Sequence, residues 1–201
     1  MRAIQIENNQ LIWSTAPEVV CGVGEVQIQV HATAVNRADL LQATGNYPPP
    51  PGASSILGLE CAGVVIAVGE GVQRVSVGDK VCALLAGGGY AEQVVVPAGQ
   101  VLPIPAGLSF SEAAALPEVF ATAYLNLYME AGLQPQEKVI LHAGASGVGT
   151  AAIQLLKCSR NPSFVTVGSA EKIEQCVKLG AAAGFDRHQG SFLQAAQEWA
   201  G

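Results

Sequence analysis

The residues with the clearest chemical potential form a glycine-rich turn, Gly144-Ala-Ser-Gly-Val-Gly149, between a short apolar run and an Ala/Leu-rich segment. This order is typical of the strand–turn–helix opening of a dinucleotide-binding unit. Glycines let the backbone approach a pyrophosphate closely, and the N–H groups that begin the helix face that phosphate. The candidate pyrophosphate-binding residues are therefore Gly144, Ser146, Gly147, Val148 and Gly149. Ser146 stands where the usual pattern has its middle glycine, and a plain helix-entry turn is the alternative.

The residues that would distinguish NADPH from NADH follow about 20 positions later, where NAD-binding folds carry an Asp or Glu that accepts from the ribose 2′-OH. Here the strand expected over 163–167 ends in Gly168-Ser169, so a 2′-phosphate would not be repelled. The Ser169 hydroxyl and the Lys172 ammonium could bind such a phosphate. We expect NADPH rather than NADH, although Lys172, next to Glu171, could equally be an ordinary solvated charge.

Alternating elements are expected around these residues. The patterns predict strands over 138–142, 163–167 and 182–186, and helices over 147–158, 170–179 and 191–200. The first of these helices would place Val148, Ala151, Ala152 and Leu155 on one face. This is a βαβαβ half of a doubly wound fold, and strands 4 to 6 are not encoded. We therefore expect a truncated chain whose first strand is an open apolar edge.

The first 116 residues are β-rich. Val26-Gln-Ile-Gln-Val30 alternates between apolar and polar residues, and 56–68 and 80–85 are further β-prone runs separated by glycine turns. Many short strands of this kind predict a small barrel, with His31 on a polar face as a solvated or hydrogen-bonded side chain. Ser109 and Glu112 form a candidate capping box before an Ala-rich helix, and another helix is expected over 119–130.

Composition and charge exclude several classes of protein. Half of the 201 residues are apolar, 13% are charged and the net charge is −6, so no nucleic-acid or anionic-membrane surface is expected. No run of about 18 apolar residues occurs, and the first seven residues predict an edge strand, so a cytoplasmic protein is expected. The five cysteines form no C-x-x-C pair, which indicates neither a disulfide framework nor a cysteine zinc site.

Several motifs, taken in order, resemble the medium-chain dehydrogenases/reductases, and within them the zinc-independent quinone oxidoreductases. The motifs are Val35–Leu40, Gly45–Gly52, Leu57–Gly63, Val68-Gly69, Gly78–Val81, Gly89–Glu92 and the glycine turn. The run from Asn36 to Leu40, with Tyr47 before four prolines, is similar to the tumour-suppressor-induced type. The resemblance spans essentially the whole chain. It implies an α/β protein with a GroES-like β-barrel over 1–117 and a Rossmann-type NADPH-binding domain over 118–201, truncated after its first βαβαβ half.

The resemblance also bears on metal binding and catalysis. Zinc-dependent relatives hold the catalytic metal with Cys, His and Cys, and the matching positions here are Asn36, Leu59 and Glu118. Leucine cannot coordinate zinc and an amide is a poor ligand, so no metal is expected. The resemblance instead implies that Tyr47 and Asn36 lie beside the nicotinamide and hydrogen-bond a quinone oxygen as negative charge develops. The alternative is that Tyr47 only anchors a loop and Asn36 satisfies backbone groups; Asp39 is expected to be a structural hydrogen-bond partner.

The family uses an aromatic residue after its third strand to cover the 2′-phosphate, and the corresponding position is Arg187, which could bind the phosphate in a bidentate fashion. The leading expectation is an NADPH-dependent oxidoreductase that passes a hydride directly to a small-molecule quinone. A reductase of activated C=C bonds and a truncated, non-catalytic isoform with weak nucleotide binding are the alternatives. The family forms homodimers, and the dimer-forming segment is expected to be missing.

Overall fold

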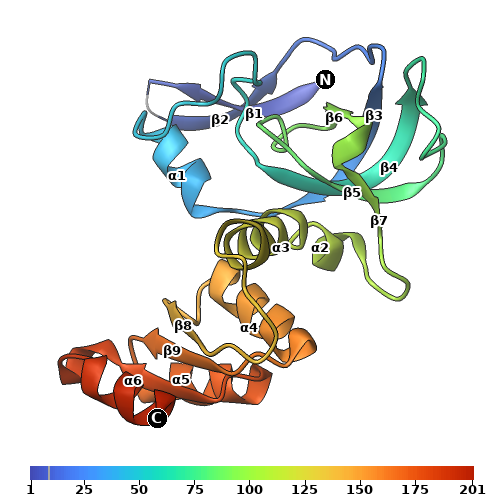
Figure 1. The fold of residues 1–201 in the computed structure, drawn as a ribbon. Helices are drawn as coiled ribbons and strands as arrows, with labels where there is room; N and C mark the ends of the chain where they lie inside the picture. Colours follow the sequence, from blue (N-terminus) through green and yellow to red (C-terminus); the bar gives the residue numbers. More distant parts are fainter. Residues whose placement is uncertain (9) are drawn as a thin grey trace. The chain divides into compact units, whose positions relative to one another are not determined.

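The chain divides into two units, Met1–Glu118 and Val119–Gly201, in a computed structural model that describes residues 1–8 and 10–201. Figure 1 colours the first unit from blue to yellow-green and the second from yellow to red. The expected α/β class is confirmed, with an antiparallel β-rich unit followed by a parallel sheet covered by helices. The expected domain limits, 1–117 and 118–201, stay a prediction.

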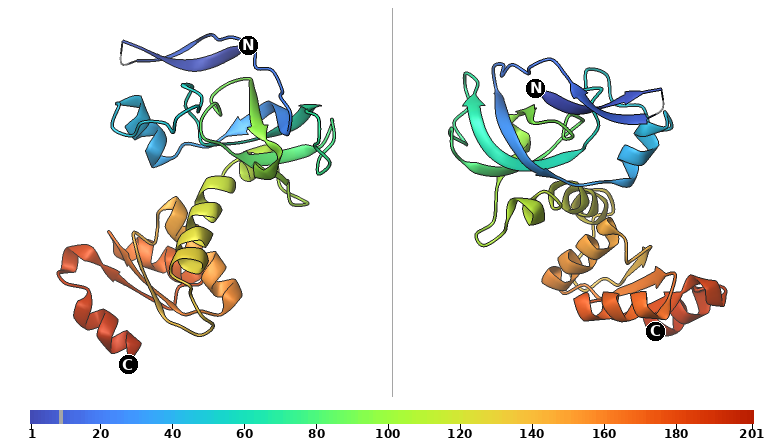
Figure 2. Two further views of the ribbon diagram at one scale, coloured as in Figure 1. Left: turned by 45° about the horizontal axis from the view of Figure 1, so that its top comes forward. Right: turned by 180° about the vertical axis from the view of Figure 1, so that it is seen from behind.

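The first unit is built on a five-stranded antiparallel sheet in the order β6-β3-β4-β5-β7. Register shifts between β3 and β4 interrupt the ladder, and such irregularities bend a sheet. The sheet is strongly curved in Figure 1 and in both views of Figure 2. Val26 and Ile28 are fully buried, which confirms the alternation expected there. The strands are β3 (Glu25–Thr33), β4 (Glu60–Val68), β5 (Lys80–Leu84), β6 (Gln93–Pro97) and β7 (Val101–Pro103).

A separate antiparallel pair and three short helices complete this unit. β1 (Arg2–Glu7) pairs with β2 (Gln10–Thr15), and a bridge between Ala3 and Ala91 joins the pair to the rest. The helices are α1 (Arg37–Ala43), η1 (Ala98–Gln100) and α2 (Phe110–Ala113). The capping box before α2 is confirmed, because Glu112 N–H donates to Ser109 Oγ and Ser109 N–H donates to Glu112 Oε2. His31 is exposed and stacks on Phe110, with ring centroids 4.5 Å apart.

The second unit is a parallel sheet in the order β10-β9-β8, the 3-2-1 order of a doubly wound half. Its central strand is buried along its whole length. Val165 faces α4 and α5, whereas Phe164 faces Trp199 of α6 at a centroid distance of 5.6 Å, so helices cover both faces. The elements are β8 (Val139–His142), α4 (Gly147–Ser159), β9 (Ser163–Val167), α5 (Ala170–Leu179), β10 (Ala183–Asp186), η3 (Arg187–Gln189) and α6 (Leu193–Ala200).

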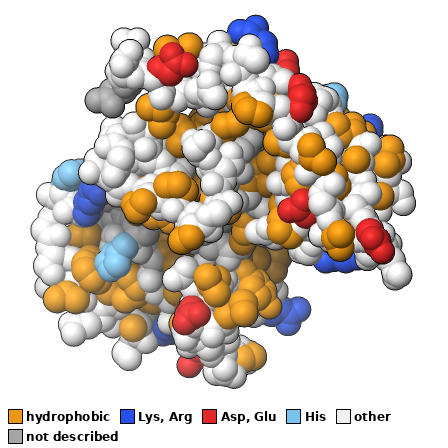
Figure 3. Space-filling view, turned by 90° about the horizontal axis from the view of Figure 1, so that it is seen from above, with side chains coloured by type: hydrophobic (Ala, Val, Ile, Leu, Met, Phe, Trp, Pro, Cys, Tyr) orange, Lys and Arg blue, Asp and Glu red, His pale blue; other side chains and the backbone are white. Residues whose placement is uncertain are grey.

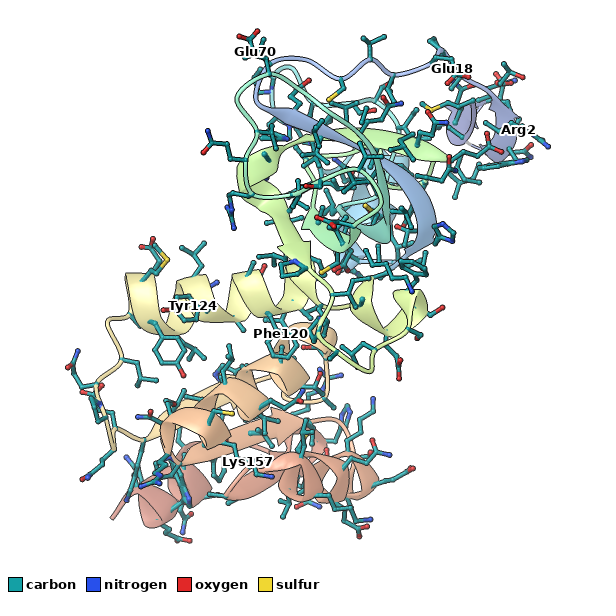
Figure 4. All side chains as sticks on the ribbon, turned by 90° about the vertical axis from the view of Figure 1, so that its right-hand side faces the viewer. Arg2, Glu18, Glu70, Phe120, Tyr124 and Lys157 are labelled. Atoms are coloured by element: carbon teal, nitrogen blue, oxygen red, sulfur yellow. The ribbon has the colours of Figure 1, made fainter. Side chains whose placement is uncertain are left out.

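Three expectations from the sequence are wrong in detail. The helix expected over 119–130 is α3 (Pro117–Tyr124) followed by a π-helical segment, η2 (Leu125–Glu130). Residues 56–59 lie before β4 and are not strand. Val148 is 37% exposed and is not among the α4 residues that pack in the core, so it does not share the buried face of the helix. The packed part of the helix meets α3, where Phe120 points toward α4 (Figure 4).

No helix within residues 1–8 and 10–201 is both long enough and apolar enough to cross a bilayer.

We expect Gly149→Ala to destabilise the chain by about 1–3 kcal/mol, because overpacking a rigid site has a cost of this order. A Cβ at Gly149 would lie 2.5 Å from the carbonyl oxygen of Ala143, and backbone cannot easily move away. Gly147→Ala is the matched control in the same turn, since its Cβ would meet only a Val119 side-chain methyl at 3.1 Å. Urea denaturation would measure both variants, and equal losses would contradict the packing argument.

Candidate functional site

A glycine turn joins β8 to α4 in the second unit. Ala143 has a φ of 54°, in the left-handed region, and the chain then passes directly against β9. A Cβ on Gly144 would lie 2.6 Å from Val165 Cβ, and a Cβ on Gly149 would overlap the turn itself. These two glycines are required by packing, whatever the turn binds. They bring the start of α4 to the carboxyl edge of the sheet, where ligands bind in open α/β folds.

Ser146 is the N-cap of α4. Its Oγ accepts from Gly149 N–H at 3.1 Å, so the hydroxyl satisfies one of the free donors at the start of the helix. The first N–H groups of a helix have no partner inside it, and those of Gly147 and Val148 lie in exposed residues. Together with the positive end of the helix dipole, they form a suitable site for a phosphate. The turn therefore brings together all the residues that the sequence assigns to pyrophosphate.

Basic side chains surround the carboxyl end of β9. The Arg187 guanidinium and His188 Nε2 lie 3.7 and 3.6 Å from the point that a Gly168 Cβ would occupy. Ser169 caps α5, because its Oγ accepts from Lys172 N–H at 3.3 Å. The Lys172 side chain is exposed on the first turn of α5. Gly168, Ser169 and Arg187 thus lie at the carboxyl end of β9, and no carboxylate stands at 168 or 169. The assignment of these residues and of Lys172 to a 2′-phosphate stays a prediction.

A pocket of about 310 Å³ opens at the same edge of the sheet. His142 Nδ1 and Thr166 Oγ1 lie 2.9 Å apart, and the His142 ring meets Phe192 edge-on at a centroid distance of 4.9 Å. The pocket is lined by His142, Ala143, Thr166, Arg187, Gly190 and Phe192. It combines a guanidinium, an imidazole and a hydroxyl with one aromatic ring, which suits a polar ligand that carries an anionic group.

One carboxylate moderates this positive charge. Asp186 ends β10, and its Oδ1 accepts from His188 N–H at 3.0 Å. Figure 3 shows charged side chains of both signs spread over the face that it draws.

In the first unit, two buried carboxylates hold Asn36. Asp39 Oδ2 accepts from Asn36 backbone N–H at 2.7 Å, and Asn36 Nδ2 donates to Glu60 Oε1 at 2.7 Å. Glu60 Oε2 accepts from the backbone N–H of Glu118 at 2.9 Å. Asp39 and Glu60 are each only 1% exposed. Asn36, which precedes α1, is therefore fixed at its backbone and at its side chain.

Asp39 is the structural hydrogen-bond partner that the sequence predicts. Tyr90 Oη donates to its Oδ2 at 2.9 Å, and Gly58 N–H donates to its Oδ1 at 3.2 Å. With Asn36, three separate segments of the chain converge on one carboxylate. This convergence satisfies the buried charge and ties α1 to the loop before β4 and to the segment before β6.

These contacts shift two ionisation equilibria. Burial raises the pKa of Glu60, while the N–H groups of Glu118 and Asn36 oppose the rise by stabilising the carboxylate. Burial is also the main reason why the pKa of Tyr90 is raised, and its hydrogen bond to Asp39 adds to the effect. Tyr90 is therefore a phenol that donates at neutral pH.

Tyr47 is placed differently. It follows α1, is 48% exposed, and its hydroxyl makes no hydrogen bond to any residue that the structure describes. The hydroxyl is free to donate to a ligand, and it does not tether the loop. The joint role of Tyr47 and the glycine turn stays a prediction.

The residues at the zinc positions of the relatives do not form a metal-ligand set. Asn36 donates to Glu60, Leu59 is a buried hydrocarbon, and Glu118 precedes the second unit. Within residues 1–8 and 10–201, no three His, Cys, Asp or Glu side chains are grouped so that they could hold an ion.

Sequence reasoning missed Glu60, Tyr90 and His188. Glu60 has a visible signal, since a carboxylate that begins the apolar run Cys61–Val65 is expected to be buried with the strand. Tyr90 carries no such signal, because its partner Asp39 lies far away in the sequence. His188 carries none either, because its position depends on the conformation of η3.

Comparison with known proteins places these observations in context. Residues 22–106 match the alcohol dehydrogenase GroES-like domain. The human synaptic vesicle membrane protein VAT-1 homolog is 38% identical over 172 residues, which are 86% of this chain and 44% of that protein. The Escherichia coli quinone oxidoreductase, solved in complex with NADPH, has a TM-score of 0.85 at 30% identity, covering 98% of this chain and 61% of that one. The CurK enoyl reductase has a TM-score of 0.83 at 34% identity, covering 92% and 59%. The chain thus spans less than half the length of the curated relative and about three fifths of the solved structures.

We expect Tyr90→Phe to lower the free energy of unfolding by about 1.5–3 kcal/mol, the usual range for a hydrogen bond to a charged group. The loss follows because a buried carboxylate would keep only its N–H donors. Tyr47→Phe, which removes a hydroxyl without a partner, should change stability by less than about 0.5 kcal/mol. If denaturant titration gave the same loss of unfolding free energy for both variants, the hydrogen bond between Tyr90 and Asp39 would not be what stabilises the fold.

Proposed function

The chain belongs to the zinc-independent, quinone oxidoreductase-like medium-chain dehydrogenases/reductases, and from this we propose that it binds NADPH and transfers a hydride to a quinone without a metal ion. The single observation that carries the proposal is the charge at the end of β9. Arg187 and His188 lie beside Gly168 there, and no acidic residue replaces Gly168 or Ser169.

The residues of the second unit fit a phosphorylated dinucleotide. We propose that the N–H groups of Gly147 and Val148 bind the pyrophosphate, while Arg187, Lys172 and the Ser169 hydroxyl bind the 2′-phosphate. Gly144 and Gly149 keep the turn close to the sheet, and Ser146 holds the first turn of α4 in place. Bound NADPH would supply the hydride, so the protein's part is to hold and orient the reactants.

The residues of the first unit would act on the acceptor. In this proposal the Tyr47 hydroxyl donates to the acceptor oxygen as negative charge develops, and Asn36 contributes a second polar group beside the nicotinamide. Support comes from the free, exposed Tyr47 hydroxyl and from the firmly held Asn36 amide.

Reduction of an activated C=C bond is the second candidate function. The CurK and JamJ enoyl reductases are among the similar solved structures, at 34% and 30% identity. The same hydrogen bond from Tyr47 to a carbonyl oxygen would serve an enone. A non-catalytic nucleotide-binding role is the remaining alternative, and the cytoplasmic location and the family homodimer stay predictions.

We expect Arg187→Gln to weaken NADPH binding by about 10- to 100-fold and NADH binding by less than about twofold, since charge-assisted hydrogen bonds to a phosphate contribute about 1.5–3 kcal/mol. Lys172→Ala should have a smaller effect in the same direction. Lys178→Gln, in the last turn of the same helix as Lys172, is the control and should change neither affinity. Calorimetric titration would measure all four proteins. An equal loss for NADPH and NADH would refute the 2′-phosphate contact.

We expect Tyr47→Phe to lower kcat about 10-fold or more with a quinone acceptor, while the NADPH dissociation constant stays within about twofold. Parallel assays with an ortho-quinone and an alkenal would separate the two candidate activities. Turnover of the alkenal alone would favour the second candidate, and unchanged kcat in the variant would remove Tyr47 from the mechanism.

A further inference from the structure

Glu60 is a buried carboxylate that lies within the motif Leu57–Gly63 but has no part in the proposed chemistry. We propose that Glu60 is a positioning residue, which holds the Asn36 carboxamide in one orientation by accepting from its nitrogen, and so sets the polar group that Asn36 offers to a ligand. The catalytic consequence of this role rests on the proposed function. The contact between Asn36 and Glu60 does not, because it lies within the first unit.

Both oxygens of Glu60 face N–H donors. Oε2 accepts from the backbone N–H of Glu118 at 2.9 Å. A backbone N–H can only donate, so the direction of this hydrogen bond is fixed. Oε1 faces Asn36 at 2.7 Å. In its ionised form a carboxylate only accepts hydrogen bonds, so ionised Glu60 requires the nitrogen, and not the oxygen, of the amide on its side. The nitrogen of the Asn36 carboxamide is therefore held on the side of Glu60, and its oxygen on the other side.

The surroundings leave Asn36 little freedom to adjust. Its backbone N–H is bound to Asp39, which is held in turn by Tyr90 and Gly58. Glu60 is 1% exposed, so water cannot readily replace either of its partners. Asn36 itself is half-buried, so part of the residue remains accessible.

This geometry predicts an unusual effect of Glu60→Gln. The oxygen of the introduced amide must accept from Glu118 N–H, which turns the introduced N–H2 group toward the N–H2 group of Asn36. Two donors then face each other, and Asn36 must reverse its amide to relieve the conflict. We expect kcat/KM with NADPH and a quinone to fall at least about 10-fold, the scale of one lost hydrogen bond.

Thr33→Val is the matched control for this variant. It removes a 2.7 Å hydrogen bond from the Thr33 hydroxyl to the backbone carbonyl of Glu60 and leaves the carboxylate alone. Because the orientation of the Asn36 amide is then unaffected, kcat/KM should stay within about twofold of the wild-type value. Equal effects of Glu60→Gln and Thr33→Val on kcat/KM would overturn the positioning role.

The test that decides the pairing exchanges donor and acceptor. A double variant that combines Asn36→Asp with Glu60→Gln keeps the net charge, and the introduced amide at position 60 can donate to the introduced carboxylate at position 36. We expect it to recover most of the unfolding free energy lost in Glu60→Gln, as coupled neighbours do in a double-mutant cycle. Additive losses in urea denaturation would overturn the pairing. If the wild-type chain oxidised no NADPH, the proposed function would fail, while the stability cycle would still judge the contact between Asn36 and Glu60.

Discussion

Burying a carboxylate costs free energy unless N–H or O–H groups surround it, and this constraint organises the first unit. Asp39 and Glu60 together accept from Asn36 twice, and from Gly58, Tyr90 and Glu118 once each. These donors come from the start of α1, the loop before β4, the segment before β6 and the start of α3. Segments far apart in the sequence are thereby fixed around one half-buried amide. A network of this kind mainly fixes the positions of its residues, because any buried polar group left without a partner would cost free energy.

The second unit depends on a different constraint, the close approach of the glycine turn to β9. Only glycine at 144 and 149 allows it, and Ser146 then closes the first turn of α4. The outcome is a set of exposed N–H groups at the carboxyl edge of the sheet, the edge at which Arg187 and His188 of η3 also lie beside Gly168. The proposed activity needs both constraints, because hydride transfer depends on geometry more than on proton chemistry.

Much of this could be predicted from the sequence, and the exceptions have physical causes. The parallel half was predictable because α4 and α5 have strong helical patterns, Ser146 and Ser169 cap them, and β9 is rich in β-branched and aromatic residues. In the first unit, β7 is a strand of only three residues, and α1 carries Leu40 on an exposed surface, so neither has a clear periodicity. The π-helical segment Leu125–Glu130 keeps a helical composition, and its hydrogen bonding cannot be deduced from residue types. Glu60 was missed because a motif names the residue but not the partners that long-range folding brings to it.

The central proposal is that the start of α4 and the end of β9 form one site for a 2′-phosphorylated dinucleotide. The most direct measurement is an NMR titration of the uniformly ¹⁵N-labelled 201-residue chain with NADPH, followed through its backbone amides. With such a site, we expect the N–H signals of Gly147, Val148, Ser169 and Arg187 to shift together and saturate at one equivalent, and NADH to produce smaller shifts at Ser169 and Arg187. Unchanged signals at the glycine turn, or identical shifts with NADH at Arg187, would contradict it.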